Sequence, residues 1–355
     1  MPLWSLITPL AAAALLALSV VLPQASATDA IGAIALVGAV IAAVHHAEVI
    51  AHRLGEPFGT LVLALAITVI EVALIVSMML AGGPDKATLP RDTIFSTLMI
   101  ICNGVIGLCL VVGSLRHHEQ VFRSEGANAG LATLIAMATL TLVLPAFTTS
   151  SPGPTYTTPQ LAFAATMSLM LWLLFVFVQT TRHRDYFLPL AQASDADAHA
   201  AQPTHHAAWA SGALLLVALV SVVGLAKVLS PSIEAALAAA GAPKAVLGIA
   251  IAMLVLLPET VAAVFAAHNN RLQTSLNLAY GSALASIGLT IPAVAVASVW
   301  LELPLVLGVD AKDLVLLMLT VVVSSITLAS GRTHVLQGAV HLVIFAAFLF
   351  LALVP

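Results

Sequence analysis

Two glutamates lie inside long apolar segments, where an ionised side chain is costly. Glu71 follows the largely apolar run 67–70, and Glu259 follows the run 256–258. A charged carboxylate at the centre of a membrane helix costs about 2.5 kcal/mol or more. A pair of such groups can hold protons or a cation, and the two states exclude one another by charge. We therefore predict a cation- and proton-binding site at Glu71 and Glu259; the alternative is that each glutamate is protonated and hydrogen-bonded between helices.

Further oxygen atoms are available for the same site. Pro258 lacks a backbone N–H, so we expect it to break its helix immediately before Glu259. Carbonyl groups freed in this way are tolerated at membrane depth only where they line a cavity or are buried in protein. Carboxylate and carbonyl oxygens are hard ligands, which suit Ca²⁺ better than soft metals. We assign Asn103, Asn277 and Ser282 to the same cation- and proton-binding site.

These candidate residues belong to a pattern that occurs twice along the chain. The repeated features, in order, are Glu48-x₆-Gly-x-Pro and Glu234-x₆-Gly-x-Pro, the internal acids Glu71 and Glu259, and Asn103-x₃-Gly107 and Asn277-x₃-Gly281. Three matches in the same order indicate an internal repeat, a common architecture among transporters. The residues that we assign to structure or gating are Glu48, Gly107, Pro258 and Gly281.

The composition excludes most other classes of protein. Of the 355 residues, 61% are hydrophobic and 8% are charged, whereas a soluble domain has roughly 45–50% and about 25%. A soluble enzyme and a disordered protein are therefore excluded, and the net charge of −4 argues against a nucleic-acid partner. The apolar residues form continuous runs rather than the alternation of an outer-membrane barrel. The chain is thus predicted to be an all-α integral membrane protein in contact with lipid.

About eleven apolar segments are long enough for transmembrane helices. They cover residues 4–23, 29–50, 58–81, 93–114, 129–148, 160–180, 207–229, 244–267, 274–298, 313–330 and 335–354. The first segment is followed by a motif typical of signal-peptide cleavage, but no Lys or Arg occurs before Arg53, so we predict a retained helix. The other ten divide five and five, and an odd number per repeat inverts the second copy. Glu71 and Glu259 should then approach each other at the bilayer midplane.

This count gives a domain organisation and an orientation. The predicted parts are an extra N-terminal helix (1–28), a first five-helix repeat (29–180), a polar cytoplasmic linker (181–206) and a second five-helix repeat (207–355). With the N-terminus inside, cytoplasmic loops hold seven Lys and Arg residues and external loops hold five. The positive-inside rule therefore predicts a cytoplasmic N-terminus and an external or periplasmic C-terminus.

Histidines gather in two places. His45, His46 and His52 lie near Glu48, and we interpret this cluster as an interfacial face or a pH-sensitive gate. The polar stretch 181–206 also contains several histidines and aspartates, which is typical of a solvated linker or of a metal- or pH-sensing segment. No HExxH motif occurs, so a zinc hydrolase has little support.

The motifs together resemble the Ca²⁺/cation antiporter superfamily, in its cation/proton exchanger branch, and within it the bacterial ChaA-type calcium (sodium, potassium)/proton antiporters. The residues that carry the resemblance are Ala47-Glu48, Arg53–Pro57, Ile70-Glu71-Val72, Pro258-Glu259, Asn277–Ala285, and Gly331-Arg332-Thr333 with Gly338. The similarity covers the chain from about residue 45 onwards. The wider family typically has Gly-Asn shortly before each glutamate, where this chain has Ile67-Thr68 and Val255-Leu256.

The resemblance implies a transporter of a bacterial inner membrane rather than an enzyme. Cytoplasmic Ca²⁺ would be exported in exchange for protons by alternating access, with the paired glutamates binding cation and proton competitively. The alternative is Na⁺/H⁺ or K⁺/H⁺ antiport on the same scaffold. No cofactor is expected beyond the transported Ca²⁺, H⁺, Na⁺ or K⁺, and the sequence does not indicate which proteins, if any, are partners. An intramembrane hydrolase would need a nucleophile or metal triad that the sequence lacks, and a non-transporting assembly factor would not need two symmetric buried acids.

Overall fold

The chain folds almost entirely into apolar helices. The computed structural model describes residues 2–21, 26–54, 58–189, 203–243 and 245–354. In this part of the chain ten helical segments are long and apolar enough to cross a membrane, and Leu3–Ser19 forms a shorter apolar helix. In a bilayer every backbone polar group must be satisfied internally, which favours helices for such runs. The prediction of an all-α membrane protein with an extra N-terminal helix is confirmed.

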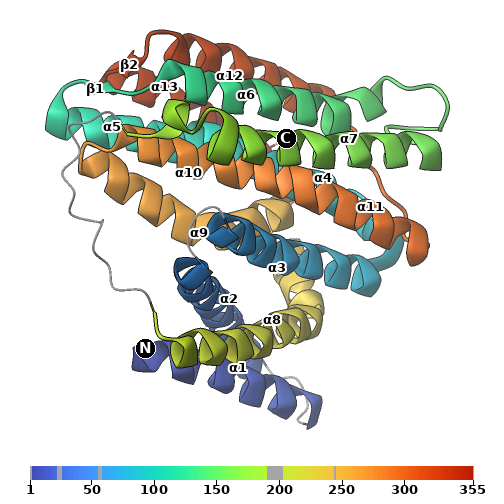
Figure 1. The fold of residues 1–355 in the computed structure, drawn as a ribbon. Helices are drawn as coiled ribbons and strands as arrows, with labels where there is room; N and C mark the ends of the chain where they lie inside the picture. Colours follow the sequence, from blue (N-terminus) through green and yellow to red (C-terminus); the bar gives the residue numbers. More distant parts are fainter. Residues whose placement is uncertain (1, 22–25, 55–57, 190–202, 244, 355) are drawn as a thin grey trace. The chain divides into compact units, whose positions relative to one another are not determined.

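Figure 1 shows how the helices and strands follow one another along the chain. The α-helices are α1 (Leu3–Val21), α2 (Ser26–Leu54), α3 (Phe58–Gly82), α4 (Leu89–Met99), α5 (Ile106–His117), α6 (Ser124–Ala138), α7 (Thr158–Phe177), α8 (His205–Ala239), α9 (Ala245–His268), α10 (Leu272–Ala285), α11 (Ile291–Trp300), α12 (Ala311–Ala329) and α13 (Val335–Leu353). Tighter or wider helical turns are η1 (Gly83–Lys86), η2 (Ile100–Val105), η3 (Thr139–Val143), η4 (Leu144–Ala146), η5 (Val178–Arg182), η6 (Arg184–Phe187) and η7 (Ser286–Thr290). The strands are β1 (Gln120–Val121) and β2 (Arg332–Thr333).

Contacts divide the chain into two compact units. The first comprises Met1–Lys86 and Ala196–Lys244, and the second Ala87–Asp195 and Ala245–Pro355. Each unit therefore contains helices from both predicted repeats. The predicted boundaries at 28, 180 and 206 describe internal similarity rather than contact, and they stay a prediction. Gly55, Pro57 and the central part of the linker lie outside the described residues.

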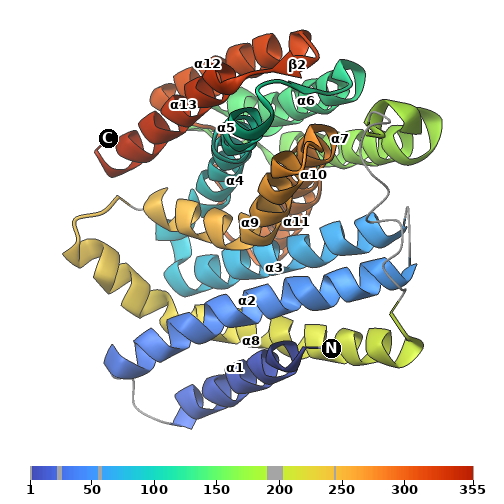
Figure 2. The ribbon, with the colours of Figure 1, turned by 90° about the vertical axis from the view of Figure 1, so that its left-hand side faces the viewer.

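In the first unit, α2 packs against α1, α3 and α8 (Figure 2). Its buried face consists largely of alanines such as Ala39, Ala43 and Ala47, and small residues allow neighbouring backbones to approach closely. The buried His46 joins three helices: its Nε2 donates to the Ser5 carbonyl of α1 at 2.8 Å, and its Nδ1 lies 3.2 Å from the Ser211 hydroxyl of α8. His46 therefore lies in a helix interface, and the interpretation of the histidine cluster as an interfacial face or a pH-sensitive gate stays a prediction.

In the second unit, two long helices widen in the middle. Residues α4–η2–α5 form one continuous helix with a π-helical segment, and α10–η7–α11 form another. The first residues of η2 and η7, Ile100 and Ser286, are 186 residues apart, the same offset that separates Glu48 from Glu234. A π-helical segment is rare and occurs frequently at functional sites. The π-helical segments of the two helices are therefore separated by the same number of residues as the repeated Glu-Gly-Pro pattern.

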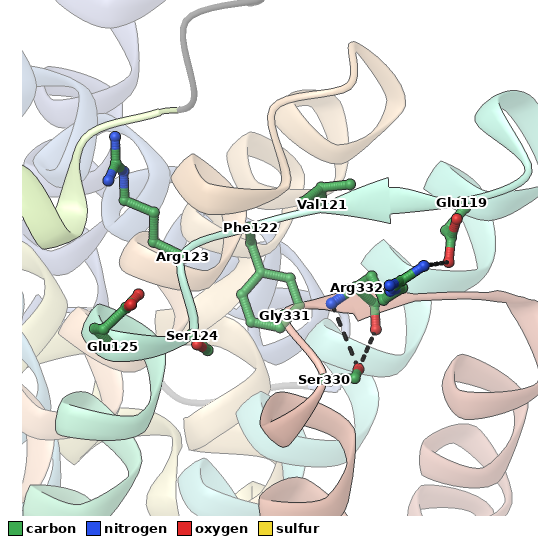
Figure 3. A pocket seen from close by; sticks show the side chains of 9 residues that line it. All are labelled: Glu119, Val121, Phe122, Arg123, Ser124, Glu125, Ser330, Gly331 and Arg332. Carbon is green, nitrogen blue, oxygen red and sulfur yellow. Dashed lines mark hydrogen bonds and ion pairs between the residues drawn. The ribbon is translucent and has the colours of Figure 1, made fainter.

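A two-stranded antiparallel sheet connects two loops of the second unit. Gln120 pairs with Thr333 and Val121 pairs with Arg332, which joins the α5–α6 connection to the α12–α13 connection. A cavity of about 530 Å³ adjoins the strands, and Figure 3 shows its lining, in which Arg332 approaches Glu119 at 3.8 Å. The lining residues are Glu119, Val121, Phe122, Arg123, Ser124, Glu125, Ser330, Gly331 and Arg332. None of the predicted site residues is among them.

Candidate cation site

Glu71 is a buried acid of the first unit. It lies in α3, inside the candidate membrane span Ala64–Lys86, and only 2% of its surface is exposed. The flanking side chains Ile70, Leu74 and Ile75 are fully buried and apolar. A carboxyl group in such surroundings is retained only where it has a function or a specific partner. Glu71 is therefore a buried acid inside a candidate membrane span, and its role in binding a cation or a proton stays a prediction.

Glu259 occupies the corresponding kind of position in the second unit. It lies in α9, half-buried, inside the span Ala245–His268, and α9 packs against α4, α5, η2 and α10. The predicted helix break at Pro258 is wrong, because α9 runs without interruption through this residue. Pro258 still removes one helical N–H, so the carbonyl of Leu254 lacks its usual backbone donor. A membrane helix tolerates such a proline when neighbouring groups satisfy the carbonyl.

Asn103 lies inside η2, at the centre of a buried polar network. Its Nδ2 donates to the hydroxyl of Thr320 at 2.9 Å, and its Oδ1 lies 3.2 Å from Nδ1 of His341. The imidazole Nε2 of His341 lies 3.1 Å from the hydroxyl of Thr327. Asn103 has no exposed surface, and His341 is 1% exposed. Sequence reasoning missed His341 and both threonines, because they come from α12 and α13, more than 200 residues away along the chain.

Asn277 has different surroundings. Its Nδ2 donates to the carbonyl of Phe187 at 2.6 Å, and its Oδ1 accepts from Gln273 at 3.0 Å. It lies in α10 before η7 begins, whereas Asn103 lies within η2. The structure therefore does not place the two Asn-x₃-Gly pairs at equivalent points. Ser282 lies further along α10, half-buried and closer to η7.

The glycines and the acid assigned to structure or gating also differ from one another. A Cβ atom on Gly107 would lie 3.0 Å from the Cβ of His341, so this glycine permits close packing of α5 and α13. A Cβ atom on Gly281 would meet no described atom within 4 Å, so close packing does not explain that glycine. Glu48 lies in α2 with an exposed side chain. The gating assignments remain predictions.

A buried ion pair was not anticipated. Arg91 and Asp92 lie in the first turn of α4, and both are only 9% exposed. The guanidinium Nε and Nη2 each lie 2.8 Å from Oδ1 of Asp92, and Nη1 donates to the carbonyl of Gly308 at 3.1 Å. Thr88 completes the shell of Asp92 with a hydroxyl donor at 3.0 Å. In the sequence, Arg91 is one of the five Lys and Arg residues assigned to external loops, and nothing there indicates its burial.

The described residues contain no group of three or more His, Cys, Asp or Glu side chains arranged to hold a metal ion. Besides carboxylates, the described residues offer neutral oxygens from Asn, Ser, Thr and the backbone. Neutral oxygens are ordinary ligands of Ca²⁺. They also suit a transport site, since a transported ion must leave as readily as it enters.

Comparison with known proteins decides the family. The family described as sodium/calcium exchanger protein matches residues 24–181 and again residues 210–354. The chain belongs to this family. It is therefore a multi-pass membrane protein and a cation antiporter rather than an enzyme, and the resemblance noted from its motifs is confirmed.

Individual relatives agree with this assignment. The chain is 49% identical over 360 residues to the y4hA protein of Sinorhizobium fredii, covering 100% of this chain and 97% of that protein. It is 34% identical over 350 residues to the sodium-potassium/proton antiporter ChaA of Escherichia coli, covering 97% and 94%. The crystal structure of the H⁺/Ca²⁺ exchanger CAX is similar in fold, with a TM-score of 0.71 at 14% identity, and covers 98% of this chain and 88% of that one.

Proposed function

We propose that this family member exports cytoplasmic Ca²⁺ in exchange for protons, and that Glu71 and Glu259 carry the exchanged charge. The observation that carries the proposal is the position of these two acids, each inside an apolar membrane span and Glu71 almost wholly buried. The family assignment supplies the reaction class, exchange of one cation for another across the membrane. Arrangement of the chain in a bacterial inner membrane fits the two bacterial relatives.

The charge balance explains the exchange. A divalent cation at membrane depth must be neutralised, and two carboxylates do this without residual charge. When the cation leaves, two negative charges would remain in a medium of low dielectric constant. Such a pair takes up protons readily, which resets the site for the next cycle. This balance corresponds to about two protons for each Ca²⁺.

Neutral oxygens complete the proposed site. Asn103 and Ser282 contribute side-chain oxygens, and the turns around η2, η7 and Pro258 have backbone carbonyls outside the regular α-helical pattern. Asn277 would contribute an oxygen only after exchanging its hydrogen bonds to Phe187 and Gln273. Each of these groups is uncharged, so the negative charge that neutralises the cation comes from the two glutamates alone.

A second candidate, Na⁺/H⁺ or K⁺/H⁺ antiport, has a specific observation in its favour. A relative that covers 97% of this chain at 34% identity is named a sodium-potassium/proton antiporter. The positions Ile67-Thr68 and Val255-Leu256 also supply few side-chain oxygens before the two glutamates. A monovalent ion needs only one negative charge and fewer ligands, so the same scaffold can bind it.

One measurement separates the two candidates. Proton flux in everted membrane vesicles containing the protein should respond to micromolar or low-millimolar Ca²⁺. Higher concentrations of Na⁺ or K⁺ should be needed for the same flux, because two carboxylates bind a divalent ion more strongly than a monovalent one. Vesicles from cells that lack the protein are the control. A response to Na⁺ or K⁺ with none to Ca²⁺ would replace Ca²⁺ by the monovalent ion in the proposal.

The orientation is also proposed, from the distribution of Lys and Arg. We expect a cytoplasmic linker at 181–206 and a C-terminus on the outer face. A fusion of alkaline phosphatase after Pro355 should be active, and a fusion of green fluorescent protein at the same position should not fluoresce. The reverse result would invert the topology, and reporters inserted after Asp195 should give the opposite signals as an internal control.

A further inference from the structure

The buried network around Asn103 joins three segments of the second unit. Asn103 belongs to η2, Thr320 and Thr327 belong to α12, and His341 belongs to α13. All four side chains are at most 3% exposed. A polar network buried to this degree is stable only if its hydrogen bonds are satisfied in consistent directions.

The direction of each bond follows from Thr320. Its hydroxyl donates to the carbonyl of Leu316 at 2.8 Å, so its oxygen can accept the amide N–H of Asn103. The Nδ2 of Asn103 therefore faces Thr320, and its Oδ1 faces His341. An amide oxygen can only accept, so Nδ1 of His341 must carry the proton and donate.

The other side of the imidazole fits the same tautomer. In a neutral ring with its proton on Nδ1, Nε2 is an acceptor, and the hydroxyl of Thr327 at 3.1 Å supplies the donor. Every bond in the chain Thr327–His341–Asn103–Thr320 then has one donor and one acceptor. The network needs no charge, which suits its depth in the membrane.

The backbone of η2 and α5 makes room for His341. A Cβ atom on Gly107 would lie 3.0 Å from the Cβ of His341, and one on Gly104 would lie 3.3 Å from the ring of Phe345. Asn103 and Gly107 are four residues apart, and both face α13. Asn103 accepts a hydrogen bond from His341, and Gly107, which has no side chain, leaves room for the Cβ of His341. The Asn-x₃-Gly pattern therefore has a local physical reason at this point of the chain.

We propose that His341 is a positioning residue for Asn103. As a neutral, Nδ1-protonated imidazole it fixes the orientation of the Asn103 amide on the wide turn of η2. It uses one lone pair of Oδ1 and leaves the second available to the transported cation. This inference rests on the proposed function in one respect, the contribution of Asn103 to cation binding. Its consequence is that His341 sets cation affinity and not the pH dependence of exchange.

The test compares substitutions at His341 in the full-length protein, assayed by proton flux in everted vesicles. H341L removes the hydrogen bonds of the imidazole to Asn103, to Thr327 and to the backbone of Cys102. It should raise the half-saturating cation concentration about fivefold to tenfold, the effect of losing the bond that orients Asn103. H341N keeps a donor near the Nδ1 position and should stay within about twofold of the parent. H341Q reaches only the Nε2 position and should resemble H341L. The pH optimum should be the same in all variants.

Controls separate this role from others. His334 lies at the N-terminal cap of α13 with an exposed side chain, so H334N should change neither half-saturation nor maximal rate. A loss of maximal rate at unchanged half-saturation in H341L, or a shift of its pH optimum, would overturn the positioning role in favour of folding or proton transfer. If H341L does not accumulate, equal half-saturation in H341N and H341Q overturns it instead.

Failure of this inference is distinguishable from failure of the proposed function. If Glu71→Gln and Glu259→Gln abolish exchange while H341L binds the cation as the parent does, only the role of His341 is wrong. If both glutamate variants exchange normally, the proposed function is wrong, whatever the histidine variants do.

Discussion

Replacing Glu259 with glutamine should abolish Ca²⁺/H⁺ exchange while the protein still accumulates in the membrane. Glutamine preserves the volume of the side chain but leaves one negative charge against a divalent ion, and the uncompensated positive charge is costly at membrane depth. Glu71→Gln should have the same effect for the same reason. Exchange is measured as Ca²⁺-dependent proton flux in everted vesicles, with the amount of folded protein determined by fluorescence-detected size exclusion.

The matched control is Glu125→Gln. Glu125 is exposed in the first turn of α6, at the very start of the span Ser124–Ala146. This variant therefore loses the same charge at an exposed helix end and should exchange at the parent rate. A well-folded Glu259→Gln protein that exchanged Ca²⁺ at close to the parent rate would show that the paired-carboxylate mechanism is wrong. Retention of Na⁺- or K⁺-driven flux in a single variant would instead favour the monovalent alternative, which needs only one carboxylate.

The second large effect concerns the contact between α5 and α13. A Cβ atom on Gly338 would lie 2.8 Å from the carbonyl oxygen of Gly107, the Cβ of Leu110 and the backbone nitrogen of Val111. Backbone atoms cannot rotate away, so Gly338→Ala must push the two helices apart. Overpacking of this kind costs about 1–3 kcal/mol. We expect a clearly lower melting temperature and less folded protein in detergent.

Gly212→Ala is the control for that substitution. A Cβ atom on Gly212 in α8 would meet no described atom within 4 Å, and alanine has the higher helix propensity. Its melting temperature should equal or exceed that of the parent. An unchanged melting temperature in Gly338→Ala would mean that α5 and α13 separate without loss, contrary to the packing described here.

The parts of the fold that could be predicted are those set by local composition. Continuous apolar runs of sufficient length determine the membrane helices, and an acid within such a run is conspicuous, which is why Glu71 and Glu259 were singled out. The contacts of Asn103 could not be predicted in this way, because its partners His341 and Thr320 are distant in sequence and come from helices whose polar residues look incidental.

Two expectations failed for reasons of context. Pro258 lies within a continuous helix, since a missing hydrogen bond in a membrane helix does not force a break when neighbouring groups satisfy the carbonyl. Asn103 and Asn277 share a spacing with a glycine but occupy different turns, and a short spacing match carries no information about which turn widens into a π-helix. The offset shared by η2, η7 and the Glu-Gly-Pro pattern is the more reliable guide to the repeat.

The contacts of α13 and of the strand before it determine when the second unit can assemble during synthesis. Strand β1 is synthesised more than 200 residues before its partner β2, and Asn103 equally precedes His341. Until α13 has been inserted, the edge of β1 and the amide of Asn103 lack these partners, and a buried polar group without a partner is destabilising by about 1–3 kcal/mol. Assembly of the second unit therefore cannot finish before α13 has been inserted. A chain released before residue 332 would be an incomplete product that membrane quality control can recognise.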